Sequence, residues 1–242
     1  MLNLAIECSG TSGSVTLADG LQEIAFQPLP SELGSVQTLA HTIANILGDN
    51  RVSAPQLISV TTGPGSFTGL RVGLSTAKML ALGWGVPIVG VDSLAAIALQ
   101  SSATHLSQAK PTVVLAIMNA FRQQVFASAW MHTDSLTCLA ASQVLEARVW
   151  QQAPDGWLDT EWTSSSPDFL VTGPGLQQYM PDLSKLNSGS VAPAHLWTPR
   201  ASEVAVLGWQ EFLAGRATSA AGLQANYVRG AAAEETIRSR SS

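Results

Sequence analysis

Short apolar runs alternate with longer segments of helical periodicity through the first hundred residues. An apolar run predicts a strand at residues 2–8, and alternating apolar and small polar residues at 12–17 predict its antiparallel partner. The other elements expected in this half are a strand at 23–27, a helix at 35–47 that begins at Ser35 and stops at Gly48, a strand at 57–61, a helix at 68–83, a strand at 87–91 and a helix at 93–100. Strands and helices in this alternation indicate a mostly parallel sheet.

A polar segment without periodicity at residues 101–110 separates these elements from a second series. We therefore expect two lobes, at residues 1–104 and 105–230, followed by a flexible tail at 231–242. The second lobe is predicted to contain strands at 112–119 and 123–130, a helix at 141–151, a loop at 154–167, a strand at 169–172, a helix starting at 176–180 and a helix at 201–214 that Ser202 caps and Gly215 ends.

The tetrapeptide Thr-Gly-Pro-Gly occurs twice, at residues 62–65 and 172–175. Each copy follows a buried strand and precedes a predicted helix. Four common turn-forming residues could match by chance, but both copies hold the same place in two strand-rich halves. This favours a duplicated α/β domain that faces its copy across a cleft.

The composition excludes several classes of protein. With 46% hydrophobic residues the chain is not disordered as a whole. A net charge of −5 and the absence of a run of Lys or Arg argue against autonomous binding to nucleic acid. The uncharged stretch at 79–91 is too short to span a bilayer and the amino terminus lacks a signal-peptide pattern, so we expect a cytoplasmic protein with free thiols at Cys8 and Cys138.

The loop after the first strand is a candidate phosphate loop. Glu7 ends a buried strand, and Ser9 and Thr11 follow among glycines whose backbone N–H groups could form an anion-binding concavity. The spacing is not that of a Walker loop. The alternative interpretation is an ordinary hairpin turn that contains glycine.

Residues 63–78 carry the most information in the chain. Two glycines and a proline form a turn, Ser66 or Thr68 can cap the helix that follows, and Gly69, Gly73, Ala77 and Ala81 recur at every fourth position. Along this side, which we call the bare stripe, the helix carries only Gly and Ala, so another helix could approach it closely. The stripe either faces a partner or packs on the protein's own sheet.

Metal and hydrolase chemistry find no support in the sequence. The histidines are His41, His105, His132 and His195, and none forms a pair with metal-ligand spacing on one helix. No GxSxG nucleophile elbow occurs. The strand that would mirror residues 2–7 ends at Met118-Asn119, without the second carboxylate that magnesium-assisted phosphoryl transfer needs.

Residues 63–78 resemble the GPGSFTGLRxGxxxAK signature of the TsaB (YeaZ) family, and PIVGVDSL at 87–94 continues it. Weaker agreement lies at 119–122, at 173–175 followed by Tyr179, and at 226–229. The chain departs from the family pattern where Glu7 and Asn119 stand in place of Asp, and where no HSQ segment is found around residues 33–37.

The resemblance implies duplicated actin-like ATPase (ribonuclease H-like) domains, an α/β fold with two lobes around a cleft. It implies a non-catalytic subunit that binds and activates the catalytic paralogue TsaD in the modification of tRNA adenosine 37 to N6-threonylcarbamoyladenosine, with the ATPase TsaE as third component. The chain would form a homodimer when alone and meet tRNA only through the complex. No cofactor is expected to bind tightly, and ATP or ADP at the partner interface is left open.

Two further interpretations remain open: an actin-like ATPase or small-molecule kinase that uses Glu7, and a metallopeptidase. The bare stripe and the helix before it, together with the implied partner, predict a partner interface in the first lobe. The interface residues expected are Leu39, Ile43, Ile46, Gly65, Ser66, Phe67, Thr68, Gly69, Arg71, Gly73 and Ala77.

Overall fold

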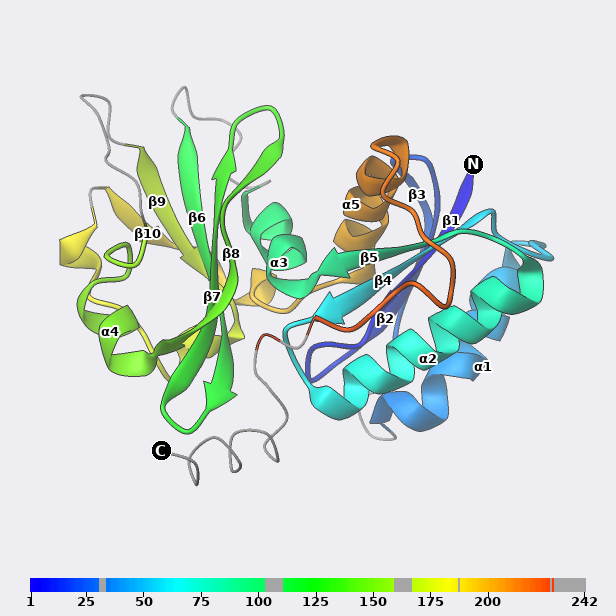
Figure 1. The fold of residues 1–242 in the computed structure, drawn as a ribbon, viewed down its shortest axis with the longest axis horizontal. Helices are drawn as coiled ribbons and strands as arrows, with labels where there is room; N and C mark the ends of the chain where they lie inside the picture. The colour runs from blue at the N-terminus through cyan, green and yellow to red at the C-terminus, as the bar shows by residue number, and fades with distance from the viewer. Residues whose placement is uncertain (31–33, 103–110, 159–166, 187, 227, 229–242) are drawn as a thin grey trace.

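Two five-stranded sheets stand side by side in the computed structural model (Figure 1). The structure describes the chain except residues 31–33, 103–110, 159–166, 187, 227 and 229–242. The first sheet has the order β3-β2-β1-β4-β5 and the second β10-β9-β6-β7-β8. The strands are β1 (Leu2–Glu7), β2 (Ser14–Asp19), β3 (Gln22–Pro28), β4 (Leu57–Gly63), β5 (Ile88–Asp92), β6 (Thr112–Phe121), β7 (Gln124–His132), β8 (Leu136–Glu146), β9 (Asp168–Thr172) and β10 (Gly189–Val191).

The two sheets share one topology. In the first, β1 pairs antiparallel with β2 and parallel with β4. In the second, β6 pairs antiparallel with β7 and parallel with β9. Both copies of Thr-Gly-Pro-Gly follow the equivalent strands, β4 and β9, so the predicted duplication of an α/β domain is confirmed.

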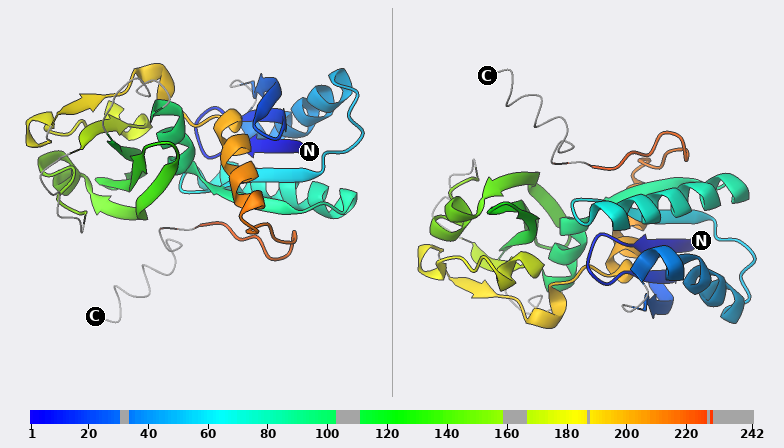
Figure 2. Two further views of the ribbon diagram at one scale, coloured as in Figure 1. Left: turned by 90° about the horizontal axis from the view of Figure 1, so that it is seen from above. Right: turned by 90° about the horizontal axis from the view of Figure 1, so that it is seen from below.

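Helices cover both faces of the first sheet. Figure 1 and the two views of Figure 2 place α1 (Gly34–Asp49) and α2 (Phe67–Trp84) on one face and α5 (Ala201–Leu213) on the other. Strand β1 explains this arrangement, because alternate residues point to opposite faces. Leu4 and Ile6 join the core beneath α1 and α2, whereas Ala5 joins the core beneath α5.

Helix α3 (Ser93–Ser102) lies between the two lobes. Leu94, Ile97 and Ala98 of this helix pack against β6 and β9 of the second sheet. Asp92 caps the helix by accepting from the N–H groups of Leu94 at 2.8 Å and Ala95 at 3.1 Å. Its other carboxylate oxygen accepts from the Ser142 hydroxyl of β8 at 2.6 Å, so one carboxylate connects both lobes.

The predicted division into lobes is wrong for the end of the chain. Helix α5 packs against β1, β2 and β4, and the residues after it return along the first sheet. Thr218 and Ile88 exchange backbone hydrogen bonds, the Asn226 N–H donates to the Thr62 carbonyl at 2.8 Å, and Leu223 is buried in the first core. Residues 201–226 therefore belong with the first lobe, because its sheet has a second apolar face to cover. The boundary at 104/105 and the tail at 231–242 lie outside the described residues.

Three local predictions also need correction. Residues 141–146 continue strand β8 because they pair with β7, and only Ala147–Gln152 form a helix, α4. The helix expected from residue 176 is a short 3-10 turn at Pro174–Gln177. At α5 the cap position is Arg200 rather than Ser202, whose hydroxyl has no partner in the described part of the chain.

The ends of α1 differ little from the prediction. The helix continues one residue past Gly48 to Asp49. The side chain of Ser35, expected as its cap, lies outside the described residues.

Candidate functional site

Glu7 ends β1 with its side chain fully buried. Its Oε1 accepts from the backbone N–H and the hydroxyl of Ser9, both at 2.5 Å, and from the Gly10 N–H at 3.3 Å. Its Oε2 has no partner among the described residues. Burial raises the pKa of Glu7 to about 7, and the hydrogen bonds from Ser9 and Gly10 offset part of that rise.

This geometry disagrees with the expectation of a phosphate loop. The N–H groups of Ser9 and Gly10 donate to the carboxylate of Glu7, which occupies the position where a phosphate would accept them. The Ser9 hydroxyl is committed to the same carboxylate, and Thr11 is exposed beyond it. The alternative interpretation of a self-contained hairpin turn fits these contacts.

The start of α2 rests on this turn. The Ser9 carbonyl accepts from the Ser66 N–H at 2.8 Å, and Ser66 caps the helix by accepting from the Gly69 N–H at 3.2 Å, as predicted. A Cβ added to Gly65 would lie 2.4 Å from the Ser9 carbonyl oxygen. The glycines of residues 63–78 thus let the helix start against the end of β1.

The bare stripe of α2 faces the protein's own sheet. A Cβ on Gly69 would lie 2.0 Å from the Cys8 carbonyl oxygen, and one on Gly73 would lie 3.1 Å from the Cys8 Cβ. Ala77 is buried in the same core as Leu39, Ile43 and Ile46 of α1. These six residues cannot form a surface for a partner, so that part of the predicted interface is wrong and the alternative, packing on the own sheet, is right. Sequence periodicity identifies such a stripe but not what covers it.

The opposite side of α2 is exposed and carries three large apolar side chains among the polar residues Thr68, Arg71 and Ser75. Phe67, Met79 and Leu82 are 50%, 68% and 71% exposed, and the Arg71 guanidinium lies 3.9 Å from the centre of the Phe67 ring. Neighbouring α1 presents Ala40, Ala44 and Gly48, which are exposed and recur at every fourth position. The α1–α2 face is our name for seven of these residues, Ala40, Ala44, Gly48, Phe67, Arg71, Met79 and Leu82. Of these seven residues only Phe67 and Arg71 were predicted to lie at the interface, although the same helical spacing could have identified the other five.

The other predicted interface residues lie at or near this face. Ser66 and Thr68 are exposed and Gly65 is half-buried at the start of α2. With Phe67 and Arg71, they remain candidates for contact with a partner.

Asn119 has a structural role in the second lobe. Its side-chain oxygen accepts from the Phe121 N–H at 2.7 Å, and its amide donates to the Gln178 side chain at 2.8 Å. It thereby closes a turn in which Phe121, Arg122 and Gln123 all have positive φ, a conformation that sequence reasoning did not find. Strand β6 contributes no carboxylate to face Glu7.

The described residues contain neither a metal-binding cluster nor a membrane-spanning helix. No group of three or more His, Cys, Asp or Glu side chains there could hold a metal ion. Among the described helices, none has the length and apolar character needed to cross a membrane.

Comparison with known proteins gives consistent matches. Residues 28–138 match the family model described as "TsaD: tRNA N6-adenosine threonylcarbamoyltransferase". The chain is 26% identical to the tRNA threonylcarbamoyladenosine biosynthesis protein TsaB of Escherichia coli (strain K12), over 93% of the chain and 94% of that protein. It is 31% identical to TsaB of Bacillus subtilis (strain 168), over 75% of the chain and 74% of that protein.

Solved structures agree on the fold. The structure titled "YeaZ from Pseudomonas aeruginosa" superposes with a TM-score of 0.74 at 20% sequence identity, over 93% of this chain and 99% of that one. At this identity the likeness concerns the fold alone, and it extends over both lobes. The predicted two-lobe α/β fold of the actin-like, ribonuclease H-like type is confirmed.

Proposed function

Because this chain belongs to the TsaB family of tRNA threonylcarbamoyladenosine biosynthesis proteins, we propose that it is a non-catalytic subunit that binds and activates TsaD. In this proposal TsaD transfers the threonylcarbamoyl group to adenosine 37, TsaE is the third component, and tRNA is contacted only through the complex. The chain acts in the cytoplasm and binds no cofactor tightly. Any ATP or ADP would lie at the partner interface.

The contacts of Glu7 support a non-catalytic role. Its carboxylate holds the loop that follows it, while Asn119 holds a turn in the other lobe. Neither arrangement provides the two facing carboxylates that would position a magnesium ion on a nucleotide. The same observation weighs against the alternative of an ATPase or small-molecule kinase.

The α1–α2 face supports partner binding, and it is the observation that carries this proposal. Large apolar side chains grouped on one helix mark interaction surfaces, and small residues on the adjacent helix allow a partner helix to approach closely. The matched segment of the TsaD family model includes both helices, so the two proteins share this part of the fold. We infer that TsaD binds here, and that two copies of the chain use the same face when TsaD is absent.

The proposal predicts that Met79→Glu weakens TsaD binding about 10-fold or more, since burying a Met side chain contributes roughly 1.5 to 3 kcal/mol. The melting temperature should barely change because the side chain is 68% exposed. Calorimetry with TsaD and sedimentation of the chain alone measure both associations. The matched control is Leu213→Glu, an equally exposed apolar residue on α5, across the sheet. Equal affinity of the two variants would place the interface elsewhere.

Activation is tested separately by measuring threonylcarbamoyl transfer to tRNA with TsaD and TsaE, with and without the chain. We expect stimulation with the chain and no transferase, kinase or protease activity from the chain alone. ATP turnover by the purified chain that is lost in Glu7→Ala would instead support the kinase alternative.

A further inference from the structure

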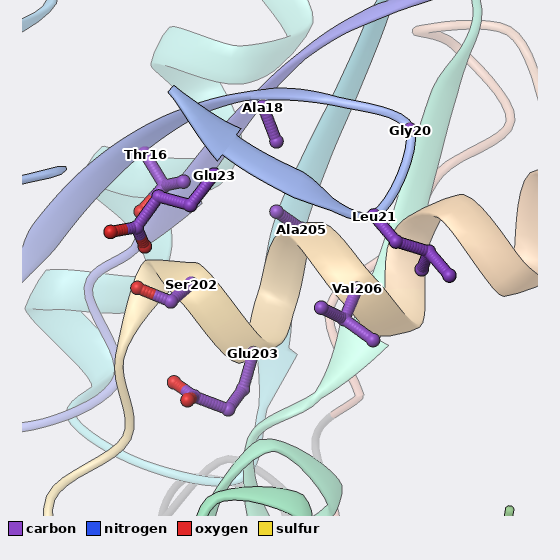
Figure 3. A pocket seen from close by; sticks show the side chains of 9 residues that line it. All are labelled: Thr16, Ala18, Gly20, Leu21, Glu23, Ser202, Glu203, Ala205 and Val206. Atoms are coloured by element: carbon purple, nitrogen blue, oxygen red, sulfur yellow. The ribbon is translucent and has the colours of Figure 1, made fainter. Parts of the chain in front are cut away.

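A pocket opens between the β2–β3 hairpin and α5 (Figure 3). Helix α5 covers the face of the first sheet opposite to α1 and α2 (Figure 1). Its oxygen-bearing side chains are Thr16 of β2, Glu23 of β3, and Ser202 and Glu203 of α5. Figure 3 shows their oxygen atoms gathered toward one side, while Leu21 and Val206 lie on the other. The pocket therefore has a polar half and an apolar half, and it is separate from the α1–α2 face.

Three buried oxygen atoms around this pocket have no hydrogen-bond partner within the described part of the chain: Thr16 Oγ1, Ser202 Oγ and Glu203 Oε2. Thr16 is fully buried on the side of β2 that faces α5, beside Ala18 of the core beneath that helix. Buried polar atoms are paired in the great majority of folded proteins. Three unpaired oxygens around one pocket indicate that a group from outside the chain completes it.

The described residues that line the pocket carry two carboxylates, those of Glu203 and the exposed Glu23, and no basic side chain. Burial raises the pKa of Glu203 to about 7, nearby Arg200 lowers it in part, and the second carboxylate, Glu23, raises it further. The Arg200 guanidinium itself stacks over the Phe26 ring at 4.3 Å. A cation bound beside Glu203 would favour the charged form of its carboxylate.

We propose that this pocket binds a primary alkylammonium group, from a free polyamine or from a lysine side chain of another protein. An ammonium has three N–H donors and no acceptor, which matches the unpartnered hydroxyl oxygens of Thr16 and Ser202 and the unpartnered Oε2 of Glu203, with Glu23 as a second carboxylate. Its methylene chain would lie along Leu21 and Val206. This apolar half favours an alkylammonium over a hydrated metal ion, whose whole surface is polar. The proposal does not depend on the role assigned to the α1–α2 face.

The test is calorimetric titration of the full chain at pH 8 with putrescine and, separately, with Nα-acetyl-lysine methylamide. At least one should bind at one equivalent, whereas 1,4-butanediol, of similar length but uncharged, should not. Tighter binding of putrescine identifies a free polyamine as the ligand, and tighter binding of the lysine derivative identifies a protein side chain. Failure of both amines to bind overturns the proposal.

Two variants locate the binding. Glu203→Gln and Thr16→Val should each weaken the amine at least 10-fold, whereas Glu211→Gln should not, because this α5 carboxylate lies outside the pocket and pairs with Arg216. Binding should also weaken between pH 8 and pH 6 as Glu203 takes up a proton beside Glu23 and Arg200. Unchanged binding in folded Glu203→Gln rejects the site. Magnesium chloride that displaces the amine, with its own binding lost in Glu203→Gln, would show a metal site instead.

Discussion

Replacing Gly69 with alanine is expected to lower the free energy of unfolding by about 3 kcal/mol, although alanine is the better helix former. The added Cβ would lie 2.0 Å from the carbonyl oxygen of Cys8, which belongs to the backbone and cannot turn away. Either α2 must move off the sheet or the end of β1 must shift. Urea denaturation followed by circular dichroism measures the change.

Gly83 supplies the matched control because it lies on the same helix with no heavy atom within 4 Å of an added Cβ. Gly83→Ala should leave stability unchanged or raise it by roughly 0.5 kcal/mol. Equal effects of the two substitutions would contradict the packing described for α2. For the same reason, Gly73→Leu should prevent folding rather than separate two partners, since its Cβ already approaches Cys8 at 3.1 Å.

Glu7→Gln is expected to change how stability depends on pH. The pKa of Glu7 is raised from 4.5 to about 7 in the folded state, so the folded chain holds a proton that the unfolded chain releases between these values. The wild-type contribution from Glu7 is therefore most favourable below pH 4.5, falls as pH rises toward 7, and stays low above it. A shift of this size corresponds to about 3 kcal/mol.

The measurement is the difference in unfolding free energy between Glu7→Gln and wild type at pH 4 and at pH 8.5. We expect the variant to gain about 3 kcal/mol relative to wild type across this range, because glutamine does not titrate. Glu211→Gln, which removes a half-buried carboxylate paired with Arg216, should not show this gain. A difference that does not vary with pH would mean that Glu7 is not held in a desolvated site.

Turn residues and helix caps were enough to predict those elements whose structure depends only on the residues within them. The two copies of Thr-Gly-Pro-Gly indicated the duplication, and Ser66 was one of the two residues, with Thr68, predicted to cap α2. Residues 141–146 were misassigned because a short segment of mixed apolar and polar residues fits either a helix or a strand, and pairing with β7 decided the outcome. The propensities of residues 141–146 carry no information about which other strand they pair with.

The predictions that failed depend on contacts between distant segments. Gly69 and Ala77 formed a visible stripe, but only the fold shows that β1 covers it. The phosphate-loop prediction failed for a local reason instead, because Glu7 accepts from its own neighbours Ser9 and Gly10. The pocket beside α5 could not be foreseen, since Thr16 and Ser202 lie at opposite ends of the sequence and neither belongs to a motif.

The return of α5 and residues 216–226 to the first sheet also sets an order of events during synthesis. When the ribosome has made β5, the first sheet has all its strands, but one face lacks its covering helix. The entire second lobe must be translated before Ala201–Leu213 emerge to cover that face. The second lobe can thus fold first even though it is made later, and the nascent first lobe exposes apolar surface in the meantime, which chaperones recognise.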